Sequence, residues 1–242
     1  VCVEAMCWPV GTADRKYAGV THVDVTDFTQ PKADALLAAC ERYGVTLSGL
    51  GYYPNPLDPD PAVADAAVTH LRRLIVAAPL LGLRTVNGFV GRDWLKTVDD
   101  NWPRFLATWR PLVKLAEDHG VRIGIENCPM LFTKDEWPGG KNLLATPAIW
   151  RRAFADIDSP SFGLNYDPSH LVLQGIDPLS PLQEFRDKLF HVHAKDIRID
   201  PRAVSEVGRF DFPNRWHQPR IPGFGDIDWA RFAAELMRVG YD

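Results

Sequence analysis

The sequence lacks the features that mark membrane, secreted and nucleic-acid-binding proteins. It has no apolar run approaching the roughly 18 to 20 residues that a membrane-spanning helix requires, and no basic segment followed by an apolar run at its start. The formal net charge is -4, whereas a nucleic-acid surface needs clustered Lys and Arg. We therefore expect a soluble, cytoplasmic protein that binds a small molecule and neither membranes nor nucleic acid.

Cysteine is scarce, and its spacing indicates no metal or redox motif. The 242 residues include 4 cysteines, without a C-x-x-C pair or zinc-ribbon spacing. Cys2, Cys7, Cys40 and Cys128 are therefore predicted to be reduced thiols. A disulfide between Cys2 and Cys7 is the alternative for an exported chain.

Short apolar segments alternate with longer amphipathic ones along the whole chain. Strands are expected at residues 1–6, 45–50, 84–89, 121–126, 162–166 and 190–195. Helices are expected at residues 32–43, 62–81, 102–119, 147–155, 178–188 and 227–239. This alternation is typical of parallel β–α units.

Two architectures are built from such units, the closed barrel and the doubly wound open sheet. The open sheet would carry a glycine-rich phosphate turn, but residues 49–51 (GLG) lack the third glycine. A (β/α)8 barrel needs eight strands. We therefore predict a TIM barrel in a single domain over residues 1–242, lacking its first and last strands, which would lie before Val1 and after Asp242. The sheet should then have an open seam between the strands at residues 1–6 and 190–195.

Three consecutive predicted strands end in residue types that commonly serve as metal ligands. They are Glu126, Asp167 and His193. In a parallel barrel the carboxyl ends of the strands meet at one mouth, so these side chains are expected to converge. Two carboxylates and an imidazole suit a divalent ion such as Mn²⁺, Mg²⁺, Co²⁺ or Zn²⁺.

Each of these residues also has a structural interpretation. Glu126 could be solvated at a strand end, although an unpaired carboxylate after an interior strand is costly. Asp167 could begin a turn. Because side chains alternate along a strand, His191 and His193 share a face, and one could pack in the core while the other binds metal. His193 lies nearer the carboxyl end and is the better candidate.

Lys195 lies on the same predicted face as His193. From there its ammonium group could reach a substrate oxygen. The alternative is that Lys195 and Asp196 form a surface ion pair.

Four segments together resemble the xylose isomerase-like sugar phosphate isomerase/epimerase family, which includes tagatose 3-epimerase-type, hydroxypyruvate isomerase and inosose-metabolising enzymes. The segments are 124–129 (GIENCP), 165–171 (NYDPSHL), 190–196 (FHVHAKD) and 222–229 (PGFGDIDW). The resemblance implies that Glu126, Asp167 and His193 are metal ligands and that Glu126 is also a catalytic acid or base. His170 would bind substrate.

Other family positions match less directly. The substrate-binding Arg after the metal His would be Arg198, which is slightly offset, or Arg202. The segment that contains Trp137 would be an active-site loop, with Trp137 against the sugar, and Trp8 is a further aromatic candidate. The family's fourth ligand, a second Glu, would lie on the strand expected after Asp242.

The resemblance implies a metal-dependent isomerase or epimerase acting on a ketose, a polyol-derived ketone or a related small sugar. Proton transfer next to the carbonyl would pass through a metal-stabilised enediolate. The alternatives are a family-related endonuclease-type metallohydrolase and a non-catalytic barrel that binds metal or sugar. The oligomeric state stays open, with a homo-oligomer as one alternative.

Overall fold

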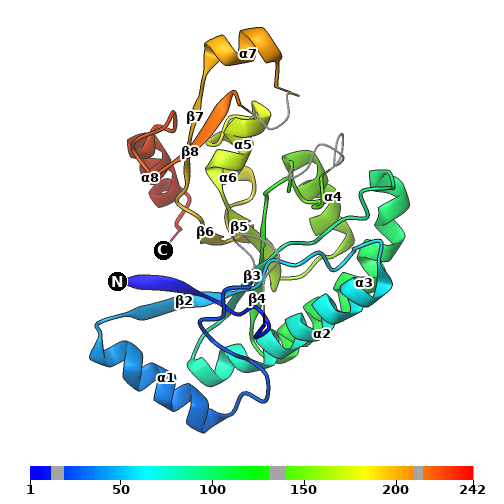
Figure 1. Ribbon diagram of the computed structural model, residues 1–242, viewed down its shortest axis with the longest axis vertical. Coiled ribbons are helices and arrows are strands. Elements are labelled where there is room, and N and C mark those ends of the chain that lie inside the picture. Colours follow the sequence, from blue (N-terminus) through cyan, green and yellow to red (C-terminus); the bar gives the residue numbers. More distant parts are fainter. Residues whose placement is uncertain (12–18, 131–139, 210–214, 242) are drawn as a thin grey trace.

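The computed structural model describes residues 1–11, 19–130, 140–209 and 215–241. A curled sheet of six parallel strands, in chain order, forms its centre (Figure 1). The strands are β1 (Cys2–Met6), β2 (Thr46–Gly51), β3 (Thr85–Gly88), β4 (Arg122–Glu126), β5 (Phe162–Tyr166) and β6 (Leu189–Val192). All six predicted strands are therefore present, and their topology is that of a β–α barrel.

The sheet has the open seam expected of six strands. Among the described residues, β1 pairs with β2 alone and β6 with β5 alone, so these two strands are its edges. The sheet nevertheless curls far enough for Glu4, in the middle of β1, to contact His193, which directly follows β6, at 2.7 Å. This curl decides which side chains meet in the interior.

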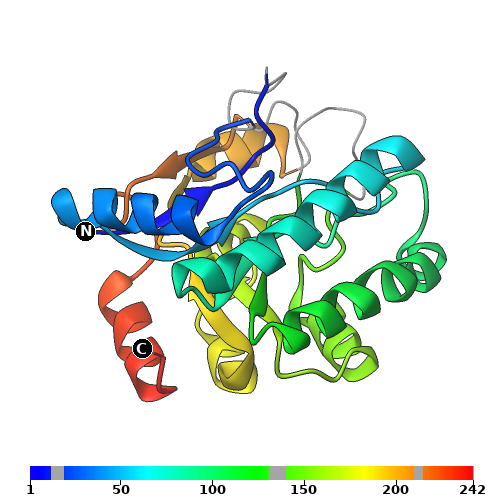
Figure 2. The ribbon, with the colours of Figure 1, turned by 90° about the horizontal axis from the view of Figure 1, so that it is seen from below.

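Most of the helices pack around the outer side of the curl (Figures 1 and 2). The helices are α1 (Gln30–Arg42), α2 (Pro61–Ala77), α3 (Val98–Asp118), α4 (Pro147–Asp156), α5 (Pro168–Gln174), α6 (Ser180–Glu184), α7 (Pro201–Val207) and α8 (Trp229–Arg238). Helix α7 lies away from the six-stranded sheet (Figure 1). No helix in the described part of the chain combines the length and apolar character needed to cross a membrane. The four cysteines are free, as predicted.

Aromatic side chains fill the layer between β5 and the helices. Trp109 of α3 and Phe154 of α4 lie with ring centroids 5.8 and 5.7 Å from Phe162 of β5. The Trp109 indole N–H donates to the Val90 carbonyl oxygen at 3.1 Å, so its burial leaves no donor unpaired. These contacts hold β5 against the helices α3 and α4.

The structure corrects several predicted boundaries. The expected helix 62–81 ends as α2 and continues as a 3₁₀ turn at Ala78–Leu81, because Pro79 has no N–H to continue the α-helical pattern. The expected helix 178–188 is α6 followed by a 3₁₀ turn at Arg186–Lys188. The sixth strand ends at Val192, because its neighbour β5 gives way to α5.

Four elements are absent from the sequence prediction. They are the short helices α5 and α7 and an antiparallel hairpin of β7 (Asp196–Ile199) and β8 (His217–Arg220). The hairpin is built from loop residues whose apolar pattern is too short to predict a strand. It lies beside α5, outside the six-stranded sheet.

Asp196 anchors this hairpin to the segment before α8, and it is not the surface ion-pair partner that the sequence allowed. Its side chain is fully buried. Its two carboxylate oxygens accept five N–H groups, those of Ile197, Gly223, Gly225, Ile227 and the Trp229 indole. The motif at 222–229 is therefore a loop that wraps a buried carboxylate.

We expect Asp196→Ala to lower the free energy of unfolding by about 2–4 kcal/mol, because several buried donors lose a charged acceptor. Urea unfolding at pH 7 measures this. The matched control is Asp118→Asn, which removes a carboxylate that is 54% exposed and should change stability by less than about 0.5 kcal/mol. A loss below about 1 kcal/mol in Asp196→Ala would contradict the anchoring role.

The same carboxylate predicts an acid-sensitive part of the stability. Burial raises the pKa of Asp196, but the Trp229 indole and the backbone N–H groups outweigh it and lower the pKa below its ordinary value. A lowered folded-state pKa adds stability above the unfolded value of about 3.9, and this stability is lost as the pH falls further. The difference in free energy of unfolding between the wild type and Asp196→Asn should therefore shrink below about pH 4 and stay constant above pH 5. Urea unfolding over this pH range measures it.

Candidate active site

Acidic and imidazole side chains from four strands meet on the concave side of the sheet. Glu4 lies on β1, Glu126 ends β4, Asp167 directly follows β5, and His193 directly follows β6. A cavity of about 490 Å³ adjoins three of them, Glu4, Asp167 and His193. Its lining residues are Cys2, Glu4, Ser48, Asp167, His191, Val192, His193, Ala194 and Lys195. Its lining extends from Cys2, at the amino end of β1, to Asp167 and Lys195, at the end of the sheet where ligands bind in parallel barrels.

The Glu126 carboxylate is buried, and two imidazoles compensate its charge. Its Oε1 lies 3.2 Å from His170 Nε2 and 3.5 Å from His193 Nδ1. Burial raises the pKa of Glu126, but the hydrogen bonds and charges of the two imidazoles hold it well below its usual range. Glu126 is therefore ionised at neutral pH, as a metal ligand or a base must be.

The two imidazoles respond in the opposite direction. Burial lowers the pKa of both imidazoles, but their neighbours raise it to about 10. The neighbours are Cys128, Asp167 and Glu126 for His170, and Glu126 and Glu4 for His193. Each imidazole can thus supply positive charge and N–H donors to the carboxylates.

The two carboxylate oxygens of Asp167 have different neighbours. Oδ1 accepts from Ser169 N at 2.9 Å and from Ser169 Oγ at 2.6 Å, which caps α5. Oδ2 is buried and accepts no hydrogen bond of good geometry, although Lys195 Nζ lies 2.8 Å and His170 Nε2 3.3 Å away. The two cationic side chains compensate the charge of this buried oxygen, and a metal ion bound to Oδ2 would take over that role.

The donor atoms present fit a divalent ion. Ligand atoms of Glu126, Asp167 and His170 all lie within 4.8 Å of one another. His193 Nδ1 adds a further nitrogen beside Glu126. Carboxylate oxygens with imidazole nitrogens suit Mn²⁺, Co²⁺ or Zn²⁺.

Five of the site residues predicted from the sequence lie together. Glu126, Asp167, His193, His170 and Lys195 gather in one cluster, with His170 and Lys195 bridging Asp167 to the rest. Their roles as ligands and substrate contacts stay predictions.

Arg198 lies elsewhere. It is on β7 and lines a separate cavity of about 620 Å³ with Arg215, His217 and Asp226. Trp137 is outside the described residues. Trp8 packs edge-on against Tyr52, with ring centroids 4.9 Å apart.

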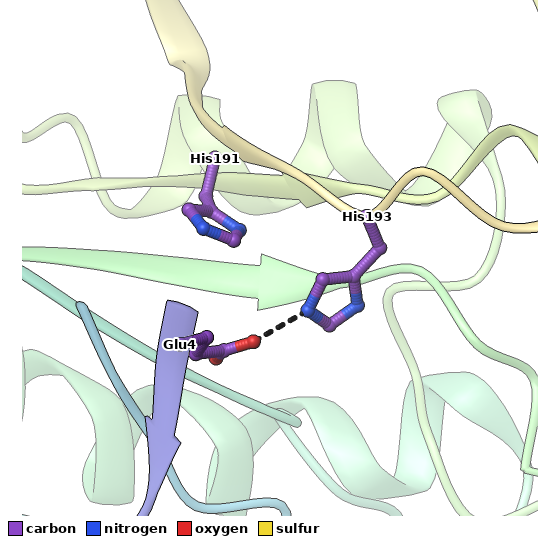
Figure 3. Close-up of side chains that lie close together, drawn as sticks. All are labelled: Glu4, His191 and His193. Carbon is purple, nitrogen blue, oxygen red and sulfur yellow. Dashed lines mark hydrogen bonds and ion pairs between the residues drawn. The ribbon is translucent and has the colours of Figure 1, made fainter. Parts of the chain in front are cut away.

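The sequence reasoning missed Glu4 and the polar residues around it. Figure 3 shows Glu4 on β1 facing His193 across the interior, with His191 beside them. Glu4 Oε2 lies 2.7 Å from His193 Nε2, and Tyr53 OH donates to Glu4 Oε1 at 2.5 Å. The sequence does contain an indication of Glu4: like Glu126, it is a single carboxylate within an apolar strand, here residues 1–6 (VCVEAM).

Asn127 ties the carboxyl ends of β4 and β5 together. Its side chain is fully buried. Its Nδ2 donates to the Asp167 carbonyl oxygen at 2.9 Å, and its Oδ1 accepts the Asp167 N–H at 2.8 Å. One amide thus pairs both backbone groups of Asp167 and fixes this carboxylate relative to Glu126.

A family model described as xylose isomerase-like TIM barrel matches residues 10–242. The chain belongs to this family. The curled parallel sheet and the cluster at its carboxyl end agree with that assignment.

Curated relatives within the family are similar over different lengths. The uncharacterized protein YfiH of Bacillus subtilis (strain 168) is 28% identical over 259 residues, covering 91% of this chain and 77% of that protein. The inosose dehydratase of Lacticaseibacillus casei is 26% identical over 146 residues, covering 60% of this chain and 45% of that enzyme. The match therefore spans less than half of the dehydratase.

Solved structures share the fold. A D-tagatose 3-epimerase-like protein has a TM-score of 0.68 at 21% identity, covering 100% of this chain and 79% of that chain. The IOLI protein, solved with a bound zinc atom, has a TM-score of 0.63 at 16% identity, covering 89% of this chain and 70% of that one.

We expect Asn127→Ala to destabilise the chain by about 2–4 kcal/mol, because two buried backbone groups lose their partners. Asn127→Asp should be at least as damaging, since a carboxylate cannot donate to the Asp167 carbonyl. Urea unfolding measures both, with Gln183→Ala on the exposed face of α6 as the control. Wild-type stability in Asn127→Ala would show that this bridge does not hold the strand ends.

Proposed function

We propose that this chain is a metal-dependent isomerase or epimerase that moves a proton at a carbon next to a carbonyl group. The substrate class is a ketose or a polyol-derived ketone. The observation that carries the proposal is the buried, ionised Glu126, which shares a cluster with Asp167 and two imidazoles in a xylose isomerase-like barrel.

Glu126, Asp167 and His193 are the proposed metal ligands. A divalent ion bound there would supply positive charge to the oxygens of the substrate as negative charge develops on them. Lys195 Nζ lies 2.7 Å from His170 Nε2, beside the same carboxylates. We assign His170 and Lys195 to bind substrate oxygens.

Glu126 is the proposed base. Its ionised carboxylate accepts the proton from the carbon next to the carbonyl, and the electron pair of the broken C–H bond moves onto the carbonyl oxygen. Return of a proton to the neighbouring carbon gives isomerisation. Return to the opposite face of the same carbon gives epimerisation.

Dehydration is a second candidate, favoured by the relatives named inosose dehydratase. The same C–H bond breaks first. A hydroxyl group on the next carbon then leaves with a proton as water, and a carbon–carbon double bond forms. The two candidates share their first step and differ in their products.

The test is proton exchange in D₂O. The purified chain is incubated with Mn²⁺ or Co²⁺ and a panel of free ketoses and inososes, and NMR follows deuterium entering the carbon next to the carbonyl. An epimer or aldose supports isomerisation or epimerisation, whereas an unsaturated ketone supports dehydration. Absence of both exchange and product over the panel, with metal bound, would contradict the proposal.

We expect Glu126→Gln to lower the exchange rate by about 10²- to 10⁴-fold, because the amide cannot take up the proton. A chelator should abolish exchange in the wild type, and added Mn²⁺ or Co²⁺ should restore it. Glu41→Gln, which removes an exposed carboxylate on α1, is the matched control. Equal rates in Glu126→Gln and the control would remove Glu126 from the mechanism.

A further inference from the structure

Both ring nitrogens of His193 face carboxylates. Nε2 lies 2.7 Å from Glu4 Oε2, and Nδ1 lies 3.5 Å from Glu126 Oε1 (Figure 3 draws the Glu4 side). Glu4 is on β1 and His193 follows β6, so the contact joins the two edges of the sheet across its concave side. An imidazole held in this way presents one nitrogen to each carboxylate.

The Glu4 carboxylate is itself oriented by its neighbours. Tyr53 OH and Asn87 Nδ2 both donate to Oε1, at 2.5 and 3.1 Å, which leaves Oε2 for His193. On the adjacent strand, a Cβ at Gly51 would lie 2.6 Å from Glu4 Oε1, so glycine leaves the space that the carboxylate fills. The backbone register also shifts between Val3 and Glu4, as bulges do where a side chain is redirected.

Glu4, His191 and His193 could be taken for a second metal site, because their ligand atoms lie within 4.8 Å of one another. The contacts of His191 argue against this. Its Nδ1 pairs with Asn165 Oδ1 at 3.0 Å and its Nε2 with Ser48 Oγ at 3.2 Å. With both nitrogens used within the protein, His191 is a packed histidine, and Glu4 has His193 as its imidazole partner.

We propose that Glu4 is a positioning residue that accepts the Nε2–H of His193 and thereby assigns Nδ1 to the divalent ion beside Glu126. The inference rests on the proposed function, since it takes His193 as a metal ligand. A carboxylate behind a ligating imidazole fixes the ring orientation and the nitrogen that carries the proton, and its loss typically weakens metal binding by about 10- to 100-fold.

The experiment measures zinc binding to the full chain by calorimetry in the wild type, Glu4→Gln, Glu4→Asp and Glu41→Gln. Glu4→Gln removes the charge, whereas Glu4→Asp keeps it but shortens the reach to His193. We expect one zinc per chain and a fall in affinity of about 10- to 100-fold in both Glu4 variants. The exposed Glu41 variant should bind like the wild type.

A second measurement reads the ring directly. In the zinc-loaded wild type labelled with ¹⁵N-histidine, NMR should show a proton on Nε2 of His193 and the ion on Nδ1. This readout needs no variant, so it decides the matter even where a Glu4 variant fails to fold. Zinc on Nε2 would overturn the inference.

The remaining outcomes separate the two proposals. Zinc affinity unchanged in both Glu4 variants overturns the positioning role alone, and so does wild-type affinity in Glu4→Asp, because charge alone would then suffice. A second zinc that disappears with Glu4 would show a separate site instead. A wild-type chain that binds no zinc overturns the proposed function and this inference together.

Discussion

The buried charge of Glu126 is the constraint on which the rest of the site depends. A carboxylate at the end of an interior strand is stable only when cations or donors surround it. The fold meets this need with His170 from α5 and His193 from the end of β6. Each of these imidazoles contacts a second acidic residue in turn, Asp167 or Glu4. Charge compensation at one residue therefore spreads into a network that spans the concave side of the sheet.

Two buried asparagines support the network. Asn127 pairs both backbone groups of Asp167, and the amide of Asn142 donates to the carbonyl oxygens of Glu126 and Cys128 at 2.9 and 2.8 Å. These asparagines are buried and hold the strand ends by hydrogen bonds to the backbone. The asparagines thus fix the backbone of the residues whose side chains face the site. Preorganised sites are supported in this way.

The hairpin β7–β8 shows how the chain adds to the barrel pattern without disturbing it. It begins at Asp196, immediately after the residues that enter the cavity, and Asp196 ties it to the loop before α8. The segment 222–229 therefore binds the buried Asp196 and contributes no side chain to the carboxylate cluster. The hairpin also carries Arg198 into a separate cavity.

The sequence alone determined the order of the six sheet strands and of the longer helices, the family, and the convergence of Glu126, Asp167 and His193. These features depend on local periodicity and on the rule that parallel strands end at one face. The tertiary structure alone decided the partners of those residues. Glu4 and His193 are separated by 189 positions and meet only because the sheet curls, and Asp196 is buried only because a distant loop folds over it. Contacts of this kind depend on the curvature of the whole sheet, which no local pattern of residues encodes.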